Sequence, residues 1–138
     1  MPVGLLKQYQ AEIHGLVRIV VGFLFMTHGG QKLFGWFGAE SSAQLMSEFG
    51  LAGVLEFFGG LMIMLGWLTG PVAFVLAGQM AVAYFWKHVP RGFWPWQNGG
   101  ELAVLYSWVF LFFATLGSGS FSIDTWLAKR KSDTGTTP

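Results

Sequence analysis

The chain has 138 residues, of which 53% are hydrophobic, 17% aromatic and only 11% charged, with a net charge of +1 and no cysteine. Ordinary soluble domains carry roughly 25% charged residues, so this composition does not fit a soluble protein and indicates a single-domain integral membrane protein. The net charge is uninformative about nucleic acid, and because no basic patch indicates it, nucleic acid is not an expected partner. Without cysteine, the chain cannot hold an iron–sulfur cluster through thiolates, so a redox role would need a bound cofactor, a quinone or a partner subunit.

The first apolar run spans about residues 13–34, close to the roughly 20 residues that a helix needs to cross a bilayer. At about 100° per residue, one face of this helix carries Arg18, Gly22, Phe25, Gly29 and Lys32, with His28 beside it. A cation facing lipid is unfavourable, so we expect this face to point toward other helices. We interpret Arg18 as a structural charge inside the membrane; its partner stays open, with Asp124 as the one acidic candidate near its depth.

Three further apolar runs follow, at about residues 51–68, 71–88 and 101–117. Short connections between runs of this length predict an all-α, up-down-up-down four-helix bundle in the membrane. Two short amphipathic segments, Ala39 to Gly50 and Phe121 to Leu127, are expected to lie at the membrane surface as interfacial helices. Residues 129–138 form a polar tail.

The distribution of lysine and arginine predicts the orientation of this bundle. The end with both termini holds Lys7, Lys129, Arg130 and Lys131, whereas the other end holds Lys32, Lys87 and Arg91. By the positive-inside rule both termini are expected in the cytoplasm, on a margin of one charge. The expected location is the inner (cell) membrane.

Polar residues that are far apart in the sequence are expected to meet at the other end of the bundle. His28 and Glu56 would lie roughly 9 and 8 Å inside that end, at 1.5 Å per residue. The candidate ligand-binding cluster is His28, Lys32, Glu56, Tyr84, His88 and Glu101. Glu56 must be paired or protonated, and a bridge to Lys32 would serve either folding or function. Lys32 could instead extend to the membrane surface, and Glu101 could merely favour a helix start.

These residues also resemble a known family. The first helix reads Arg18…Gly22…Phe25…His28-Gly-x-x-Lys32-Leu-Phe-Gly, and the second reads Glu56-x-x-Gly-Gly…Leu65-Gly. Gly-Gly-Glu101 and Gly117-x-Gly-x-x-Ser-x-Asp124 complete a pattern similar to the DoxX family of small four-span membrane proteins. That family is named for subunits associated with archaeal quinol oxidase and thiosulfate:quinone oxidoreductase, and a mycobacterial member is described as part of a membrane oxidoreductase complex. The resemblance implies a membrane redox setting and supplies no catalytic residues.

We therefore expect a subunit or accessory of a quinone-linked redox system, with quinone bound at the polar cluster and a redox enzyme as partner. His28, Lys32 and Glu56 would bond the ligand, and Tyr84 would stack on its ring. The alternatives are a non-catalytic membrane scaffold and, with less support, a small proton-linked transporter, which would have to form a homo-oligomer. No metal site is predicted, and haem is not expected because the histidines lack a dedicated ligand spacing. Whether the chain has its own activity stays open.

Overall fold

The computed structural model describes residues 3–39 and 47–135, and these ranges contain helices and no strand. The long helices are α2 (Gln10–Phe34), α3 (Glu48–Leu65), α4 (Thr69–Ala83) and α6 (Glu101–Leu116). The shorter elements are α1 (Val3–Lys7), η1 (Trp36–Gly38), the π-helix η2 (Tyr84–His88), η3 (Val89–Arg91), α5 (Pro95–Asn98) and α7 (Ile123–Thr134). The predicted all-α class is confirmed.

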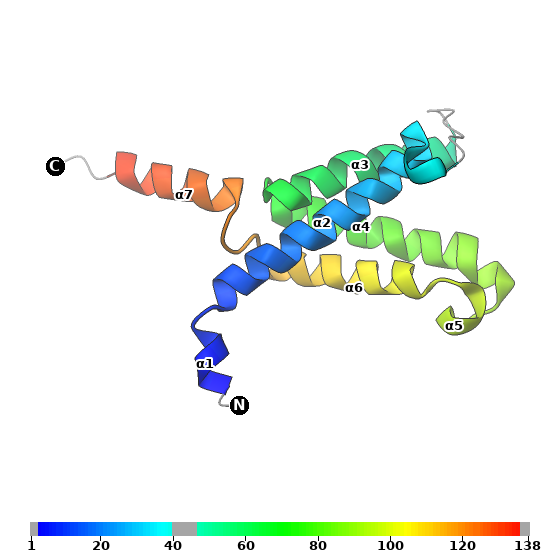
Figure 1. Ribbon diagram of the computed structural model, residues 1–138, viewed down its shortest axis with the longest axis horizontal. Helices are drawn as coiled ribbons and strands as arrows, with labels where there is room; N and C mark the ends of the chain where they lie inside the picture. Colours follow the sequence, from blue (N-terminus) through cyan, green and yellow to red (C-terminus); the bar gives the residue numbers. More distant parts are fainter. Residues whose placement is uncertain (1–2, 40–46, 136–138) are drawn as a thin grey trace.

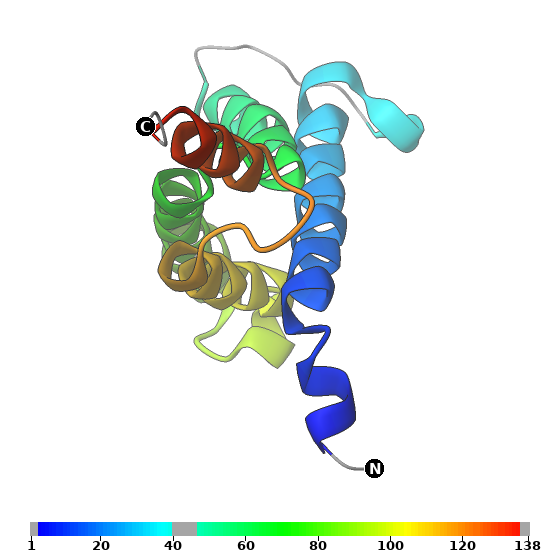
Figure 2. The ribbon, with the colours of Figure 1, turned by 90° about the vertical axis from the view of Figure 1, so that its left-hand side faces the viewer.

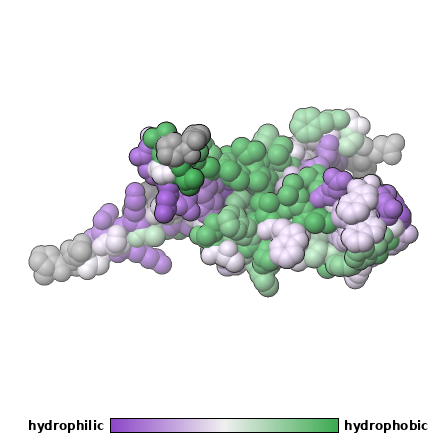
Figure 3. All heavy atoms as spheres, turned by 90° about the horizontal axis from the view of Figure 1, so that it is seen from below, coloured by the Kyte–Doolittle hydropathy of each residue, from purple (hydrophilic) through white to green (hydrophobic). Residues whose placement is uncertain are grey.

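Three helical segments are long and apolar enough to cross a membrane, namely Gln10–Phe34, Glu48–Leu65 and Thr69–Arg91. The fourth, α6, is also apolar but has 16 residues, so a fourth crossing stays a prediction. Large hydrophobic side chains are exposed along these helices, among them Phe74, Trp108 and Phe112. Figure 3 shows hydrophobic residues over the middle of the molecule and hydrophilic residues on the projecting α7. This surface is that of a membrane protein whose helices face lipid.

The long helices run alternately along one axis and form two closely packed pairs, α2 with α3 and α4 with α6 (Figures 1 and 2). We call the end near Phe34, Glu48, His88 and Glu101 the cavity end, and the end with the Gly66–Thr69 turn and residues 117–122 the turn end. In Figure 1 the two pairs lie close at the turn end and diverge toward the cavity end. The short α1 extends away from the bundle at the turn end (Figure 2).

Glycines bring α2 and α3 into backbone contact. A Cβ added at Gly22 would overlap the backbone nitrogen of Met64, and one at Gly29 would overlap that of Phe57. Small residues of this kind are the usual means by which helices approach closely inside a membrane. The polar face predicted for the first helix is thus turned toward α3.

The core lies between the two pairs on the turn-end side of the molecule. Phe25, Ile63, Leu76 and Phe110 are each at most 1% exposed, and Phe25 packs edge-on to Phe110 with ring centroids 4.8 Å apart. These four residues come one from each long helix, so the core joins both pairs.

Several predicted bounds differ from the structure. Helix α3 begins at Glu48 rather than near residue 51, because the Ser47 hydroxyl accepts a hydrogen bond from the Gly50 amide and caps it. Helix α4 begins before Pro71, since proline is tolerated in a first turn. The tail is helical up to Thr134. Most of the surface helix predicted between Ala39 and Gly50 lies outside the described residues.

Candidate functional site

A cavity of about 660 Å³ lies between the two helix pairs at the cavity end. Its walls are mostly apolar, with Phe25, Leu55, Met80, Trp86 and Leu102 among the lining residues. Its polar lining consists of His28, Lys32, Glu48, Glu56, Gln79, Lys87, His88 and Tyr106. This volume and this balance of apolar wall with a few polar groups are typical of a small-molecule site.

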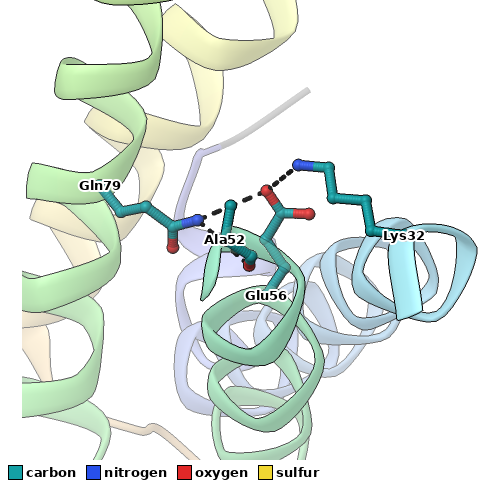
Figure 4. A network of polar contacts seen from close by, with 4 residues as sticks. All are labelled: Lys32, Ala52, Glu56 and Gln79. Atoms are coloured by element: carbon teal, nitrogen blue, oxygen red, sulfur yellow. Dashed lines mark hydrogen bonds and ion pairs between the residues drawn. The ribbon is translucent and has the colours of Figure 1, made fainter. Parts of the chain in front are cut away.

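Glu56 is the buried centre of the polar wall. Its side chain is 3% exposed, and its Oε1 lies 2.5 Å from the ammonium of Lys32, which is 26% exposed. Gln79 on α4 approaches the same oxygen from the other side and donates to it at 3.4 Å (Figure 4). The Lys32 ammonium also lies 5.3 Å from the ring centroid of Phe49. Three elements, α2, α3 and α4, therefore meet at one carboxylate oxygen.

The other oxygens of this network have no hydrogen-bond partner among the described residues. Glu56 Oε2 and Gln79 Oε1 are both buried and both unpartnered there. Meanwhile the donors of the network, Lys32 Nζ and Gln79 Nε2, already point to Glu56 Oε1. The buried part of the wall consequently has two hydrogen-bond acceptors to spare, which suits a ligand carrying hydroxyl groups.

Aromatic side chains and an exposed ion pair complete the cavity. His28 lies edge-on to Tyr106 with ring centroids 6.1 Å apart. At the rim, Lys87 of η2 bonds Glu48 of α3 at 3.0 Å, and both side chains are largely exposed. Because exposed pairs contribute little to stability, this contact connects the two helix pairs weakly across the mouth.

The structure places the six predicted cluster residues in two groups. Four of them, His28, Lys32, Glu56 and His88, line the cavity, whereas Tyr84 and Glu101 do not. The Tyr84 hydroxyl donates to the carbonyl of Phe93, and the ring is buried against the loop that follows. Glu101 is exposed at the first turn of α6.

Asn98 explains why Tyr84 belongs to the loop. This residue is 3% exposed, its Nδ2 donates to the Gly92 carbonyl at 2.7 Å, and its Oδ1 accepts from the Gly100 amide at 2.8 Å. It also donates to the Tyr84 hydroxyl at 3.3 Å. The loop between η2 and α6 is therefore held by the hydrogen bonds of Asn98, which fix the position where α6 begins.

Arg18 is completely buried at the turn end, and its partners are backbone carbonyls. Its Nε donates to Ser118 O at 2.7 Å and its Nη1 to Ile63 O and Met64 O at 2.8 and 2.7 Å. Its Nη2 donates to Ser120 O and Phe121 O at 3.0 and 2.8 Å. All five donors of the guanidinium are used, and the last carbonyls of α3 gain a cation where the helix dipole favours one.

Asp124, the acidic candidate considered for Arg18, instead caps α4. Its Oδ1 and Oδ2 accept hydrogen bonds from the amides of Leu68 and Thr69 at 2.9 and 3.0 Å. Leu68 and Phe121 adopt left-handed conformations, with φ of 50° and 58°, which are strained for non-glycine residues. Bonds to Asp124 and Arg18 hold both, so the segment after α6 locks the turn end, where it crosses toward α2 (Figure 2).

Three residues of these networks were missed by sequence reasoning. Gln79 and Tyr106 are polar residues inside apolar runs, nine residues before His88 and five after Glu101, which was a signal available in the sequence. Asn98 sits in a loop between glycines and prolines, and nothing in the sequence marks it as buried. Among residues 3–39 and 47–135, no three His, Asp or Glu side chains gather as a metal site.

The model of the DoxX family matches residues 14–89, which include the Lys32–Glu56 pair and Arg18. The chain belongs to the DoxX family. This DoxX protein is 38% identical over 135 residues to an uncharacterized protein of Haemophilus influenzae, covering 91% of this chain and 98% of the relative. It is 33% identical over 124 residues to the inner membrane protein YqjF of Escherichia coli, covering 83% and 92%. No solved structure matches it.

Proposed function

We propose that this DoxX protein is a subunit or accessory of a quinone-linked redox system of the inner membrane, and that its cavity holds the ring of a quinol. The observation that carries the proposal is the buried Glu56 carboxylate, held by Lys32 and Gln79 on the wall of an otherwise apolar cavity. The name of the relative YqjF supports the location, and the family resemblance supports the redox setting.

The hydrogen-bonding pattern favours the reduced ligand. A quinol offers two hydroxyl donors, and the network holds unpartnered acceptors at Glu56 Oε2 and Gln79 Oε1. The terminal torsion of a glutamate side chain is broad, so the Glu56 carboxylate can turn an oxygen toward the cavity. His28, whose ring lies beside Tyr106, is the second polar group that can receive a hydroxyl hydrogen bond.

The apolar walls suit the remainder of such a molecule. Phe25, Met80 and Leu102 line the cavity, and the apolar helices around it are exposed where lipid would lie. A methylated ring gains from leaving water, at about 25 cal/mol per Å² of apolar area buried. When bound, a quinol supplies two electrons and two protons. The residues of this chain bind the ring, orient its hydroxyls and hold a proton at Glu56.

A titration with duroquinol, a tetramethylated quinol, tests this proposal. The thermal unfolding midpoint of the purified protein in detergent should rise with duroquinol, and its dimethyl ether, which has no donors, should have little effect. Glu56→Gln should weaken duroquinol binding about tenfold, which corresponds to the loss of one charge-assisted hydrogen bond. The shift of the unfolding midpoint with duroquinol is measured for each variant from that variant's own midpoint without ligand.

The matched control is Glu101→Gln, which removes an exposed carboxylate at the same end and should bind duroquinol as the wild type does. Equal binding of the quinol and its dimethyl ether would contradict the proposal. Wild-type affinity in Glu56→Gln would contradict the role of Glu56.

A non-catalytic scaffold is the second candidate, and the network itself favours it. Lys32, Glu56 and Gln79 connect three helices, as a structural pair would. Absence of any duroquinol effect, together with strong coupling between Lys32 and Glu56, would favour the scaffold. The transporter alternative gains no support, because the packed core of Phe25, Ile63, Leu76 and Phe110 lies between the cavity and the turn end.

A further inference from the structure

A second hollow lies at the turn end, on the opposite side of the core from the cavity. This groove is apolar and is formed by Ile19 of α2, Met64 and Leu65 of α3, Phe121 just before α7, and Ile123 and Trp126 of α7. Phe121 and Trp126 are 61% and 55% exposed. The groove lies between the apolar helices α2 and α3 and the start of α7, and the projecting α7 is hydrophilic (Figure 3).

The first turn of α7 is held by hydrogen bonds, although the helix buries none of its own residues. The Ser122 hydroxyl caps it by accepting from the Thr125 amide at 3.1 Å, and Asp124 ties its first turn to α4. A helix of 12 residues that buries none of its side chains is marginal in water, so a surface that α7 meets would stabilise it.

The charges of α7 indicate what that surface carries. One turn after the groove come Lys129, Arg130 and Lys131, with Asp133 beyond them. The guanidinium of Arg130 lies 4.8 Å from the ring centroid of Trp126, which itself lines the groove. A guanidinium stacked in this way keeps its planar edge of donors available for a phosphate.

We infer that the groove and the Lys129–Lys131 cluster together bind an anionic phospholipid at the turn end. One acyl chain lies against Ile19, Met64 and Leu65, and the phosphate group meets the Arg130 guanidinium, with Trp126 between the two. Both oxygens of the Asp124 carboxylate accept hydrogen bonds from the amides of Leu68 and Thr69, so they are not available to pair with Arg130 in place of the phosphate. The site is independent of the quinol cavity and of the orientation of the chain.

The test compares the thermal stabilisation of the purified full chain by dioleoyl phosphatidylglycerol and by dioleoyl phosphatidylcholine in detergent. Phosphatidylglycerol should raise the unfolding midpoint at lower concentration than phosphatidylcholine, and high salt should reduce this difference. The triple variant Lys129→Gln, Arg130→Gln, Lys131→Gln should need at least about tenfold more phosphatidylglycerol for the same shift. These side chains are exposed, so the variant should fold normally.

A matched control removes exposed positive charges elsewhere, as Lys7→Gln with Arg91→Gln, and should keep the wild-type lipid response. Trp126→Ala, which removes the groove wall and the platform of Arg130, should lose most of it. Equal effects of the two lipids, or a full response in the triple variant, would overturn the inference. Equal stabilisation by inorganic phosphate alone would also overturn it, because the occupant would then be a free anion. A dimer that Trp126→Ala dissociates would overturn it too, because the occupant would then be a second copy of the chain.

Discussion

Replacing Arg18 with leucine should disrupt the turn end more than any other single change there. The guanidinium is 0% exposed and donates to five backbone carbonyls at 2.7 to 3.0 Å. Each bond contributes about 1 kcal/mol, and the cost of desolvating the charge, which the variant avoids, is subtracted from their sum. Arg18→Leu should therefore lower the free energy of unfolding by about 3–5 kcal/mol.

Arg18→Lys separates charge from geometry. An ammonium keeps the positive charge but has three donors, so at least two of the five carbonyls lose their partner. The expected loss is about 2 kcal/mol, between the wild type and Arg18→Leu. A variant that behaved like the wild type would show that charge alone matters at this position.

Unfolding by increasing mole fraction of dodecyl sulfate in mixed micelles, followed by circular dichroism, measures both variants. Lys7→Leu is the control, because Lys7 is an exposed cation near the same end. If Arg18→Leu lay within about 0.5 kcal/mol of the wild type, the carbonyl network would not hold the turn end and the reasoning would be refuted.

Two further predictions concern α2 and α3. Lys32→Met should destabilise the protein by about 3 kcal/mol because it leaves the buried Glu56 carboxylate without its partner. Glu56→Gln should destabilise it less, because Lys32 is partly exposed, and the double variant should recover much of the loss. Unchanged stability in both single variants would show that the pair is not buried. Gly22→Ala should cost at least about 1–3 kcal/mol, since its Cβ would meet the α3 backbone, whereas the control Gly78→Ala, with open space around it, should be neutral or slightly stabilising in the same assay.

Much of the helix arrangement could be predicted because the bilayer simplifies the problem. Apolar runs of membrane length predict helices, and the charged face of the first one requires partners inside the protein. The residues of that face, Arg18, Gly22, Phe25 and Gly29, are all buried in α2. Helix depth then brought Lys32 to the level of Glu56, and the two lie 2.5 Å apart.

The networks at the two ends could not be predicted because they depend on backbone atoms. Five carbonyls surround Arg18, and carbonyls carry no sequence signature, so the sequence indicates the acidic residue Asp124 as its candidate partner instead. Asp124 binds amides at the start of α4 for the same reason. Likewise Tyr84 turned away from the cavity because Asn98 and the Phe93 carbonyl hold its hydroxyl.

The central claim, that the cavity beside Glu56 binds a quinol ring, is tested most directly by photolabelling with an azido-substituted quinol. Irradiation of the protein with this probe should label lining residues of α3, α4 and α6, such as Leu55, Met80 and Ala103, and excess duroquinol should prevent that labelling. Labelling that duroquinol does not reduce, or that falls on the exposed outer faces at Phe74 and Phe112 instead, would contradict it.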